Sequence, residues 1–446
     1  MTIAPRPWVA ELDPYVPGRP AGSEDGSLAS NESALGASPA VRAAITQAAA
    51  RIHRYPDPLA DEVRAALARE LGVGPDHLLV GNGSDELVYL LVIAFAAMGG
   101  RTVCADPAYR MHDIVPRVLG CKVTRVPLRD WVHDLEAMAG IQAELAFVCN
   151  PHNPSGTAVS HGEIARFAAL SKADLIVVDE AYIDFADDPQ GTSALDLIGL
   201  GNVVVLRTFS KLFGLAGLRI GYLIGPRDVV TTLQKVRPPF SVNSIAQSAA
   251  VAALADLEHR ARARAETLAA RDMTVAMFAA AGYQIVPSQA NFVLVLTPHA
   301  DELAQALAQL GVSVRPGRAL GVADAVRVSI PSASGLALLD NALAKIGAPA
   351  GAPIPPAHRP ATALRGSPRR GHGQHGGRAS RTAVRRDRRS SRTHHLPRQQ
   401  RRISDQRHLH SCRHRRTGRL AEFAPPPAPG AQPGDDPPDT PGGDGR

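Results

Sequence analysis

The chain has 446 residues with 49 Lys and Arg against 42 Asp and Glu, and its formal net charge of +7 at first suggests a nucleic-acid-binding protein. The charge is unevenly distributed, because residues 351–446 hold 20 Arg and 7 acidic residues, whereas the first 350 residues carry a net charge of −6. A mildly acidic body of this length has room for a large core and argues against a nucleic-acid-binding surface spread over the folded part.

Residues 349–446 are predicted to form a disordered tail rich in Arg, Pro and Gly. Pro and Gly make up about 27% of residues 351–446, and apolar residues do not recur there at helical or strand spacing. Arg without any Lys, together with Pro, Gly and His, is also what a GC-rich gene yields when it is read in a shifted frame. The tail can be interpreted as a frameshift product or as an arginine-rich arm that binds nucleic acid, and we favour the frameshift product.

Short apolar runs alternate with helical patterns between about residues 77 and 236. Strands are predicted at His77–Val80, Thr102–Ala105, Lys122–Val126, Leu145–Cys149, Leu175–Val178, Val203–Leu206 and Ile220–Ile224. Helices are predicted between several of them, at Asp85–Ala97, Glu163–Ser171 and Asp228–Val236. Because strands buried on both faces lose their polar alternation, this order predicts an α/β domain with a mainly parallel sheet sandwiched by helices.

An Ala-rich helical stretch, Ser244–Ala280, separates this unit from a smaller α+β unit. In the smaller unit, strands are predicted at Asn291–Leu296, Val312–Val314 and Val326–Ile330, and helices at Asp301–Leu310 and Gly335–Ile346. We therefore predict four parts: an N-terminal segment 1–47 that packs on the small domain, a large domain 48–280, a small C-terminal domain 281–348 and the tail 349–446.

Nothing in the sequence predicts a membrane or a metal partner. No basic segment followed by an apolar one opens the chain, and the longest apolar run, Leu87–Met98, is too short to span a bilayer. The four cysteines show neither a CxxC pair nor metal-ligand spacing. We expect a cytoplasmic protein.

Polar residues follow the predicted strands at the sheet edge where sites form in open α/β folds. Asp179 ends one apolar run, although an Asp in such a place is more often a cap or an ion-pair partner than a catalytic residue. Lys211, one of only five lysines, follows Thr208 and Ser210 and precedes Arg219. A lysine that forms a Schiff base, beside hydroxyl and guanidinium donors for a phosphate, is what a pyridoxal phosphate enzyme requires. The structural alternative is a solvent-facing Ser-Lys turn.

Two loops add to this set. Gly81-Asn-Gly-Ser-Asp-Glu86 lies between a predicted strand and a helix, where free backbone N–H groups and the helix dipole favour a phosphate. Asn150-Pro-His-Asn-Pro-Ser-Gly-Thr157 follows another strand and can aim the amide of Asn153 at a ring hydroxyl. The first signal is weak by itself, because ordinary strand-to-helix turns look alike.

Together these blocks resemble the fold-type I pyridoxal phosphate aminotransferases, and more narrowly the histidinol-phosphate aminotransferase family. The blocks are Gly83-Ser-Asp85, Asn153-Pro-Ser-Gly156, Asp179-Glu-Ala-Tyr182, Ser210-Lys211 and Arg219. The likeness covers about Trp8 to Ile346 and extends to aromatic amino acid aminotransferases of actinobacterial type. Two places depart from the family pattern: the motif Asn31-Glu-Ser-Ala-Leu-Gly36 on the substrate side, and His152, where the family usually has a small polar residue.

The resemblance implies an aspartate aminotransferase-like fold with pyridoxal 5'-phosphate bound in the large domain. Its catalytic residues would be Lys211, which holds the cofactor and moves a proton, Asp179, which pairs with the pyridine nitrogen, and Tyr182, which bonds the ring oxygen with Asn153. Tyr109 would stack on the ring. The residues implied at the cofactor phosphate are Gly83, Ser84, Asp85, Thr208, Ser210 and Arg219, with Tyr55 reaching the cofactor of the partner subunit in a homodimer.

The resemblance also implies how a small-molecule substrate binds. Arg327 and Arg315 would bind its anionic group, with Tyr15 and Asn291 nearby. We place histidinol phosphate first as the amino donor and 2-oxoglutarate as the acceptor, because residues 81–86 look more like that branch. The second interpretation is an aromatic (phenylalanine) aminotransferase, and a related threonine-phosphate decarboxylase shares the core motifs. The rival from another class is nucleic-acid binding through the Arg-rich tail.

Overall fold

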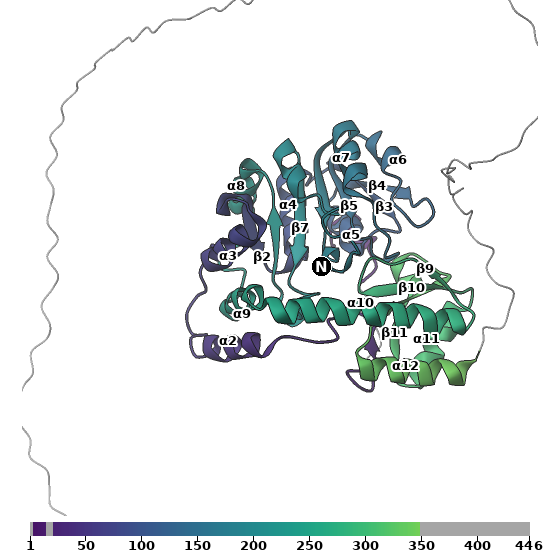
Figure 1. Ribbon diagram of the computed structural model, residues 1–446. Helices are drawn as coiled ribbons and strands as arrows, with labels where there is room; N and C mark the ends of the chain where they lie inside the picture. Colours follow the sequence, from purple (N-terminus) through teal and green to yellow (C-terminus); the bar gives the residue numbers. More distant parts are fainter. Residues whose placement is uncertain (1–2, 15–20, 348–446) are drawn as a thin grey trace, which may run out of the picture. The chain divides into compact units, whose positions relative to one another are not determined.

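The computed structural model describes residues 3–14 and 21–347 of the chain. The predicted tail and Tyr15 lie outside these residues. Within them, the strands form one seven-stranded and one five-stranded sheet, which Figure 1 shows with their helices. No helix in the described ranges has both the length and the apolar character needed to cross a bilayer.

The larger sheet has the strand order β2-β8-β7-β6-β5-β3-β4. Its strands are β2 (Leu78–Gly81), β3 (Arg101–Asp106), β4 (Lys122–Pro127), β5 (Ala143–Cys149), β6 (Ala173–Asp179), β7 (Val203–Thr208) and β8 (Gly221–Ile224). Strands β3 to β7 pair in parallel, whereas β8 is antiparallel to both of its neighbours. The predicted α/β class and the mainly parallel sheet are confirmed.

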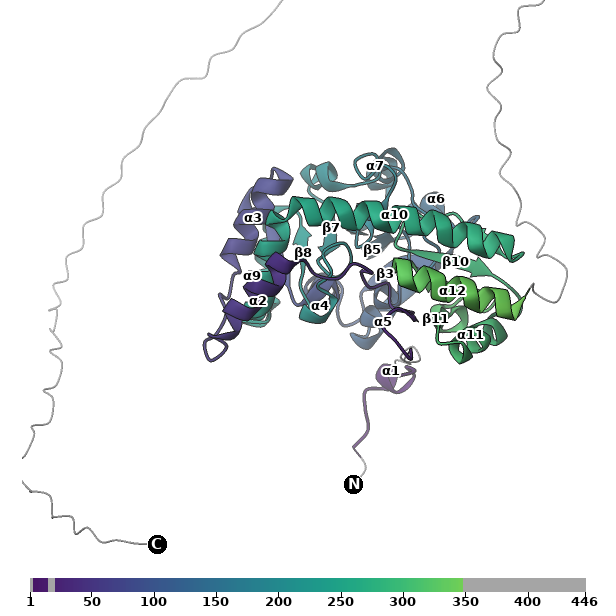
Figure 2. The same cartoon turned by 60° about the horizontal axis from the view of Figure 1, so that its bottom comes forward.

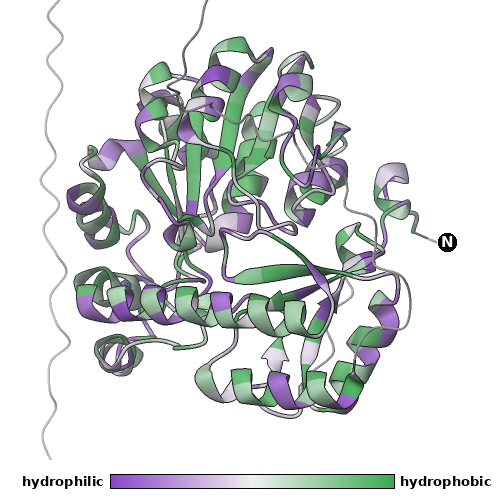
Figure 3. Ribbon diagram, turned by 45° about the vertical axis from the view of Figure 1, so that its right-hand side comes forward, coloured by the Kyte–Doolittle hydropathy of each residue, from purple (hydrophilic) through white to green (hydrophobic). Residues whose placement is uncertain are grey.

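Both faces of this sheet are buried, as the continuous apolar runs predict. In β6, Leu175 and Val177 contribute to one apolar cluster and Ile176 and Val178 to the other. One face is covered by α4 (Gly83–Phe95), α5 (Arg110–Val118) and α8 (Arg227–Val236), and the other by α3 (Asp61–Leu71), α6 (Leu135–Ala139), α7 (His161–Leu170) and α9 (Ser244–Ala255). Figure 3 shows apolar strands between helices that are polar on the outside. Because β5, β6 and β7 are parallel, the side chains at their carboxyl ends come together at one edge of the sheet.

The smaller sheet has the order β1-β11-β12-β10-β9. It consists of β1 (Ser27–Leu28), β9 (Gln284–Val286), β10 (Phe292–Leu296), β11 (Ser313–Pro316) and β12 (Ala325–Ser329), with α11 (Ala300–Gln309) and α12 (Ala333–Ile346). Strand β1 comes from the N-terminal segment and pairs in parallel with β11, and the other pairs are antiparallel. Further along the same segment, α2 (Pro39–Ala49) packs against α9, one of the helices that cover the large sheet.

The predicted helical stretch Ser244–Ala280 is two helices in the structure. Between α9 and α10 (Leu257–Ala280), Asp256 leaves the helical conformation with φ −91° and ψ 73°, and its carboxylate accepts a hydrogen bond from the His259 N–H. Asp256 therefore caps the second helix, which is a common role for Asp. Helix α10 packs against β9, β10 and α12, and so reaches the unit of the small sheet (Figures 1 and 2).

The remaining elements are short. They are α1 (Pro7–Ala10) and the 3₁₀ helices η1 (Pro75–His77), η2 (Ile183–Phe185), η3 (Leu195–Leu200), η4 (Ala216–Leu218) and η5 (Gly317–Leu320). The indole N–H of Trp8 in α1 donates to the Val118 carbonyl at the end of α5, at 3.1 Å. This bond holds the N-terminal helix beside the large sheet.

Candidate active site

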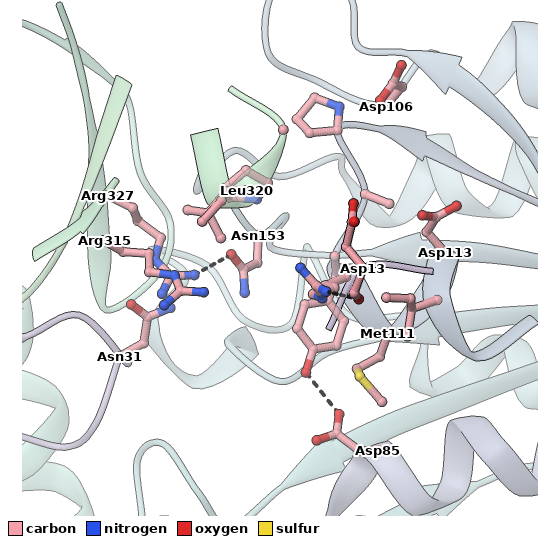
Figure 4. A pocket seen from close by; sticks show the side chains of 18 of the residues that line it. Asp13, Asn31, Asp85, Asp106, Met111, Asp113, Asn153, Arg315, Leu320 and Arg327 are labelled. Carbon is pink, nitrogen blue, oxygen red and sulfur yellow. Dashed lines mark hydrogen bonds between the residues drawn. The ribbon is translucent and has the colours of Figure 1, made fainter. Parts of the chain in front are cut away.

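A cavity of about 770 Å³ opens at the carboxyl edge of the large sheet and is also lined by the small sheet and the N-terminal segment (Figure 4). An adjoining cavity of about 420 Å³ shares Tyr109, Tyr182 and Lys211 with it. The structure brings most of the predicted site residues to these two cavities, namely Ser84, Asp85, Tyr109, Asn153, Asp179, Tyr182, Thr208, Ser210, Lys211, Arg219, Arg315 and Arg327.

Lys211 lies in the loop after β7 and is half-buried. Its Nζ donates to the Ser30 carbonyl at 3.3 Å and lies 5.6 Å from the ring centroid of Tyr182. Burial, followed by the positive charge of Arg327, lowers the pKa of Lys211 to about 8. A neutral amine is therefore accessible near physiological pH, as a nucleophile or a general base requires.

Asp179 ends β6 and is paired with a histidine that the sequence analysis missed. His112 Nε2 lies 3.1 Å from Asp179 Oδ2, and both side chains are buried. The His112 ring stacks on Phe147 with centroids 4.8 Å apart and meets the edge of Tyr109. His112 follows Tyr109 by about one helical turn at the start of α5, and this spacing is the sequence signal that could have placed it at the site. The Asp179 carboxylate is thus held in a fixed orientation at the floor of the site.

A group of N–H, hydroxyl and guanidinium donors surrounds the start of α4. Gly83 has φ +80°, and a Cβ on it would lie 2.8 Å from a guanidinium nitrogen of Arg219, so the backbone approaches the arginine closely. Thr208 Oγ1 donates to Ser210 Oγ at 2.9 Å. Helix N–H groups, hydroxyls and a guanidinium in one place can bind a phosphate.

The carboxylate of Asp85 accepts hydrogen bonds from two neighbouring side chains at the start of α4. It accepts from the Tyr109 hydroxyl at 2.9 Å (Figure 4) and from Arg219 Nη2 at 3.4 Å. These bonds fix the Tyr109 ring at the cavity wall and Arg219 beside the helix start. A carboxylate repels phosphate, so position 85 can offer an anion its backbone N–H and not its side chain.

Two amides meet at the hydroxyl of Tyr182. Asn153 Nδ2 and Asn31 Nδ2 each donate to Tyr182 Oη at 3.1 Å. Burial raises the pKa of Tyr182 to about 12, so the phenol carries its proton at neutral pH. The sequence motif that begins at Asn31 did not predict this contact with Tyr182.

Two arginines lie side by side on neighbouring strands of the small sheet. Arg315 and Arg327 are directly opposite in the antiparallel pair β11–β12, and each is only 6% exposed. Arg327 donates to Asn153 Oδ1 and to the Ala29 carbonyl, both at 2.7 Å (Figure 4). Like charges placed opposite one another are unfavourable by themselves. An anionic ligand between them would remove that cost, so the pair has the chemistry of an anion site.

The structure does not bring every predicted residue to the cavity. Tyr55 is 82% exposed and stacks on Phe240 at 4.6 Å, in a separate surface hollow. Asn291 reaches the site indirectly, because its Nδ2 donates to the Asn31 carbonyl at 3.0 Å. Tyr15 is outside the described residues. The buried His152 links two loops, since one ring nitrogen contacts Ser155 Oγ and the other the Pro107 carbonyl.

Comparison with known proteins supplies a family for this geometry. The sequence model of the aminotransferase class I and II family matches residues 26–346. The chain is 40% identical over 346 residues to a histidinol-phosphate aminotransferase of Anaeromyxobacter sp., a match that covers 74% of this chain and 95% of the relative. It is 43% identical over 339 residues to an aromatic amino acid aminotransferase of Mycobacterium tuberculosis, covering 74% and 94%.

The fold is also similar to solved structures. The histidinol-phosphate aminotransferase of Sinorhizobium meliloti, crystallised with pyridoxal-5'-phosphate, has a TM-score of 0.69 and 28% identity, with 76% of this chain and 98% of that chain covered. An aspartate aminotransferase variant of Thermus thermophilus has a TM-score of 0.67 at 24% identity and supports the fold alone.

Proposed function

The chain belongs to the class I and II aminotransferase family, and from this premise we propose that it transfers the amino group of histidinol phosphate to 2-oxoglutarate. It is a pyridoxal phosphate-dependent aminotransferase. The observation that carries the choice of donor is the buried pair Arg315 and Arg327 in the lining of the cavity. Guanidinium groups suit a phosphate or carboxylate better than an uncharged aromatic ring.

The donor set of the cavity fits pyridoxal phosphate: an amine of lowered pKa, a buried carboxylate and a phosphate-binding group at a helix start. Bound pyridoxal phosphate supplies an aldehyde that exchanges the amino group and an electron-withdrawing ring that stabilises negative charge on the substrate carbon. In our proposal Lys211 would hold the cofactor covalently in the resting enzyme, and the substrate amine would replace it and release Nζ as a free amine. The released Nζ would then take the proton from the substrate carbon and return it on the cofactor side, a task suited to a pKa of about 8.

The remaining residues of the proposed cofactor site hold and orient the ring. Asp179, with its orientation fixed by His112, would keep the proton on the pyridine nitrogen. Tyr182 and Asn153 would bond the ring oxygen, and Tyr109 would cover one ring face. The phosphate would lie against the N–H groups of Gly83, Ser84 and Asp85 and the side chains of Thr208, Ser210 and Arg219.

The choice of amino donor can be tested by steady-state kinetics. We expect kcat/KM for histidinol phosphate to exceed that for phenylalanine by at least about tenfold, because charge-assisted hydrogen bonds to the phosphate strengthen binding. Arg315→Leu should lower the histidinol phosphate value by about 10²-fold, whereas Arg318→Leu, at an exposed arginine of the same cavity, should change it little. A preference of the wild type for phenylalanine would reverse our order.

An aromatic amino donor is the second candidate. It is favoured by the 43% identity to the mycobacterial aromatic amino acid aminotransferase, which is slightly higher than the identity to the histidinol-phosphate enzyme. Apolar side chains such as Leu12, Met111 and Leu320 also line the cavity. In this case Arg327 would bind a carboxylate, and the phenylalanine rate would be the higher one.

We further propose that the enzyme is a cytoplasmic homodimer in which Tyr55 reaches the cofactor phosphate of the partner subunit. The exposed pair of Tyr55 and Phe240, beside the 66% exposed Ile52, supports this, because such an apolar patch is typical of an interaction surface. We keep the proposed large domain 48–280, which would bind the cofactor, and the small domain 281–348, whereas the N-terminal segment contacts both, with β1 on the small sheet and α1 and α2 against helices of the large one.

Replacing Tyr55 by phenylalanine tests the dimeric site. The variant should remain a dimer by light scattering but bind the cofactor about tenfold more weakly, because one hydrogen bond to a charged phosphate is lost. Tyr283→Phe, which changes a tyrosine of the small-sheet core, is the matched control and should bind the cofactor normally. A fully active monomer would contradict the shared site.

A further inference from the structure

The side chain of Asn31 connects the N-terminal segment to both sheets. Asn31 is 1% exposed and has φ +56°, in the left-handed region. Its Nδ2 donates to Tyr182 Oη at 3.1 Å, its Oδ1 accepts from Ser329 Oγ at 3.0 Å, and its backbone N–H donates to the same Ser329 oxygen at 2.8 Å. Figure 4 shows Asn31 at the cavity, beside Arg315 and Arg327.

The other partners of the two amides agree with their orientation at Tyr182. Asn153 Oδ1 must face Arg327, because a guanidinium only donates, and its Nδ2 therefore faces the phenol. In the structure, Ser329 Oγ accepts from the Asn31 N–H and donates its own proton to Asn31 Oδ1. This leaves Asn31 Nδ2 as the end that faces Tyr182.

The phenol oxygen of Tyr182 consequently accepts two hydrogen bonds, and its own proton has to point in a third direction. Within the part of the chain that the structure describes, no acceptor for that proton is found at hydrogen-bond distance. Tyr182 is only 4% exposed and lines both cavities. The hydroxyl proton is therefore directed into the cavity.

The charged and titratable groups around Tyr182 come from several parts of the chain. They are Arg327 on β12, Asp179 on β6, the Cys149 thiol at the end of β5 and Lys211 after β7, together with the Tyr109 phenol just before α5. Burial raises the pKa of Tyr182, while Arg327 and the hydrogen bond from Asn31 act in the opposite direction. Asn31 thus acts on the phenol without adding a charge.

We propose that Asn31 is a positioning residue that acts through Tyr182: by donating to the phenol oxygen together with Asn153, it aims the hydroxyl proton at the cofactor ring oxygen. This inference rests on the proposed function, which gives Tyr182 that partner. The motif that begins at Asn31 departs from the family pattern. This inference gives it a role in the cofactor chemistry as well as on the substrate side.

The backbone conformation of Asn31 dictates which variants are informative. Asn31→Gly removes the amide but suits φ +56°, whereas an alanine there would add backbone strain. Asn31→Asp keeps an acceptor for Ser329 but offers Tyr182 an oxygen in place of the N–H donor. Both variants remove the donation to Tyr182 by different routes, so a folding defect in one does not affect the test by the other.

The test uses the holoenzyme and follows the absorption of the bound cofactor as a function of pH. A bond from Tyr182 to the ring oxygen favours the deprotonated form of the chromophore, so its loss raises the pH midpoint. We expect Asn31→Gly and Asn31→Asp to raise the midpoint by about one pH unit and to lower kcat by about tenfold. KM should change less than kcat, because both ends of the Asn31 amide are engaged by Tyr182 and Ser329.

A double variant separates this role from general stabilisation. If Asn31 acts through Tyr182, the variant with both Asn31→Gly and Tyr182→Phe should have the midpoint of Tyr182→Phe alone, because the two effects are not additive. Additive shifts, or a wild-type midpoint in Asn31→Gly while Tyr182→Phe shifts, would overturn the inference but leave the aminotransferase function intact. A wild-type enzyme that shows no bound chromophore and no transamination would instead overturn the proposed function.

Discussion

Replacing Lys211 with alanine is expected to abolish covalent attachment of pyridoxal phosphate and to lower the transamination rate by about 10⁴-fold or more. Lys211 offers a half-buried amine beside Tyr182 at the carboxyl edge of the large sheet. Borohydride treatment of the wild type should fix the cofactor on the peptide that contains residue 211, as mass spectrometry can show. The variant should give no such adduct.

A second lysine provides the matched control for this experiment. Lys235 is exposed on α8, away from the lining of both cavities, so Lys235→Ala should keep the adduct and the wild-type rate. An adduct that persists in the Lys211→Ala variant would show that another amine holds the cofactor.

The lowered pKa of Lys211 also gives the attachment reaction a defined pH dependence. With a pKa of about 8, Nζ is mostly protonated below pH 8 and mostly neutral above it. Because the neutral amine is the nucleophile, the rate of attachment to cofactor-free enzyme should rise about tenfold per pH unit below 8 and level off above it. A rate that keeps rising to the usual lysine pKa of about 10.5 would contradict the effect of burial.

Much of the large sheet and of its site could be predicted from the sequence. Strands buried on both faces appear as continuous apolar runs, and β6 ends in a carboxylate at Asp179. Since the ends of parallel strands meet at one edge, the polar residues after β5, β6 and β7 were expected to lie together. The structure places Asn153, Asp179 and Lys211 around the adjoining cavities for this reason.

The residues that could not be predicted depend on long-range contacts. Asn31 bonds Ser329, which is 298 residues away, and His112 bonds Asp179, 67 residues away. No local periodicity indicates such pairs. The helix break at Asp256 was also missed, because the Ala-rich sequence on both sides favours helix and a single capping Asp resembles an ordinary surface residue.

The pairing of Asp179 with His112 predicts the second large effect. Asp179→Asn keeps the shape of the side chain but removes the negative charge proposed to hold a proton on the ring nitrogen, so kcat should fall by about 10³-fold. His112→Phe can keep the stacking on Phe147 and loses only the bond to Asp179, so it should cost about tenfold. Both variants should be compared with the wild type in kcat and in the absorption of the bound cofactor. A kcat near the wild-type value in Asp179→Asn would refute the role of the carboxylate, and equal losses in the two variants would mean that the pair acts as one unit.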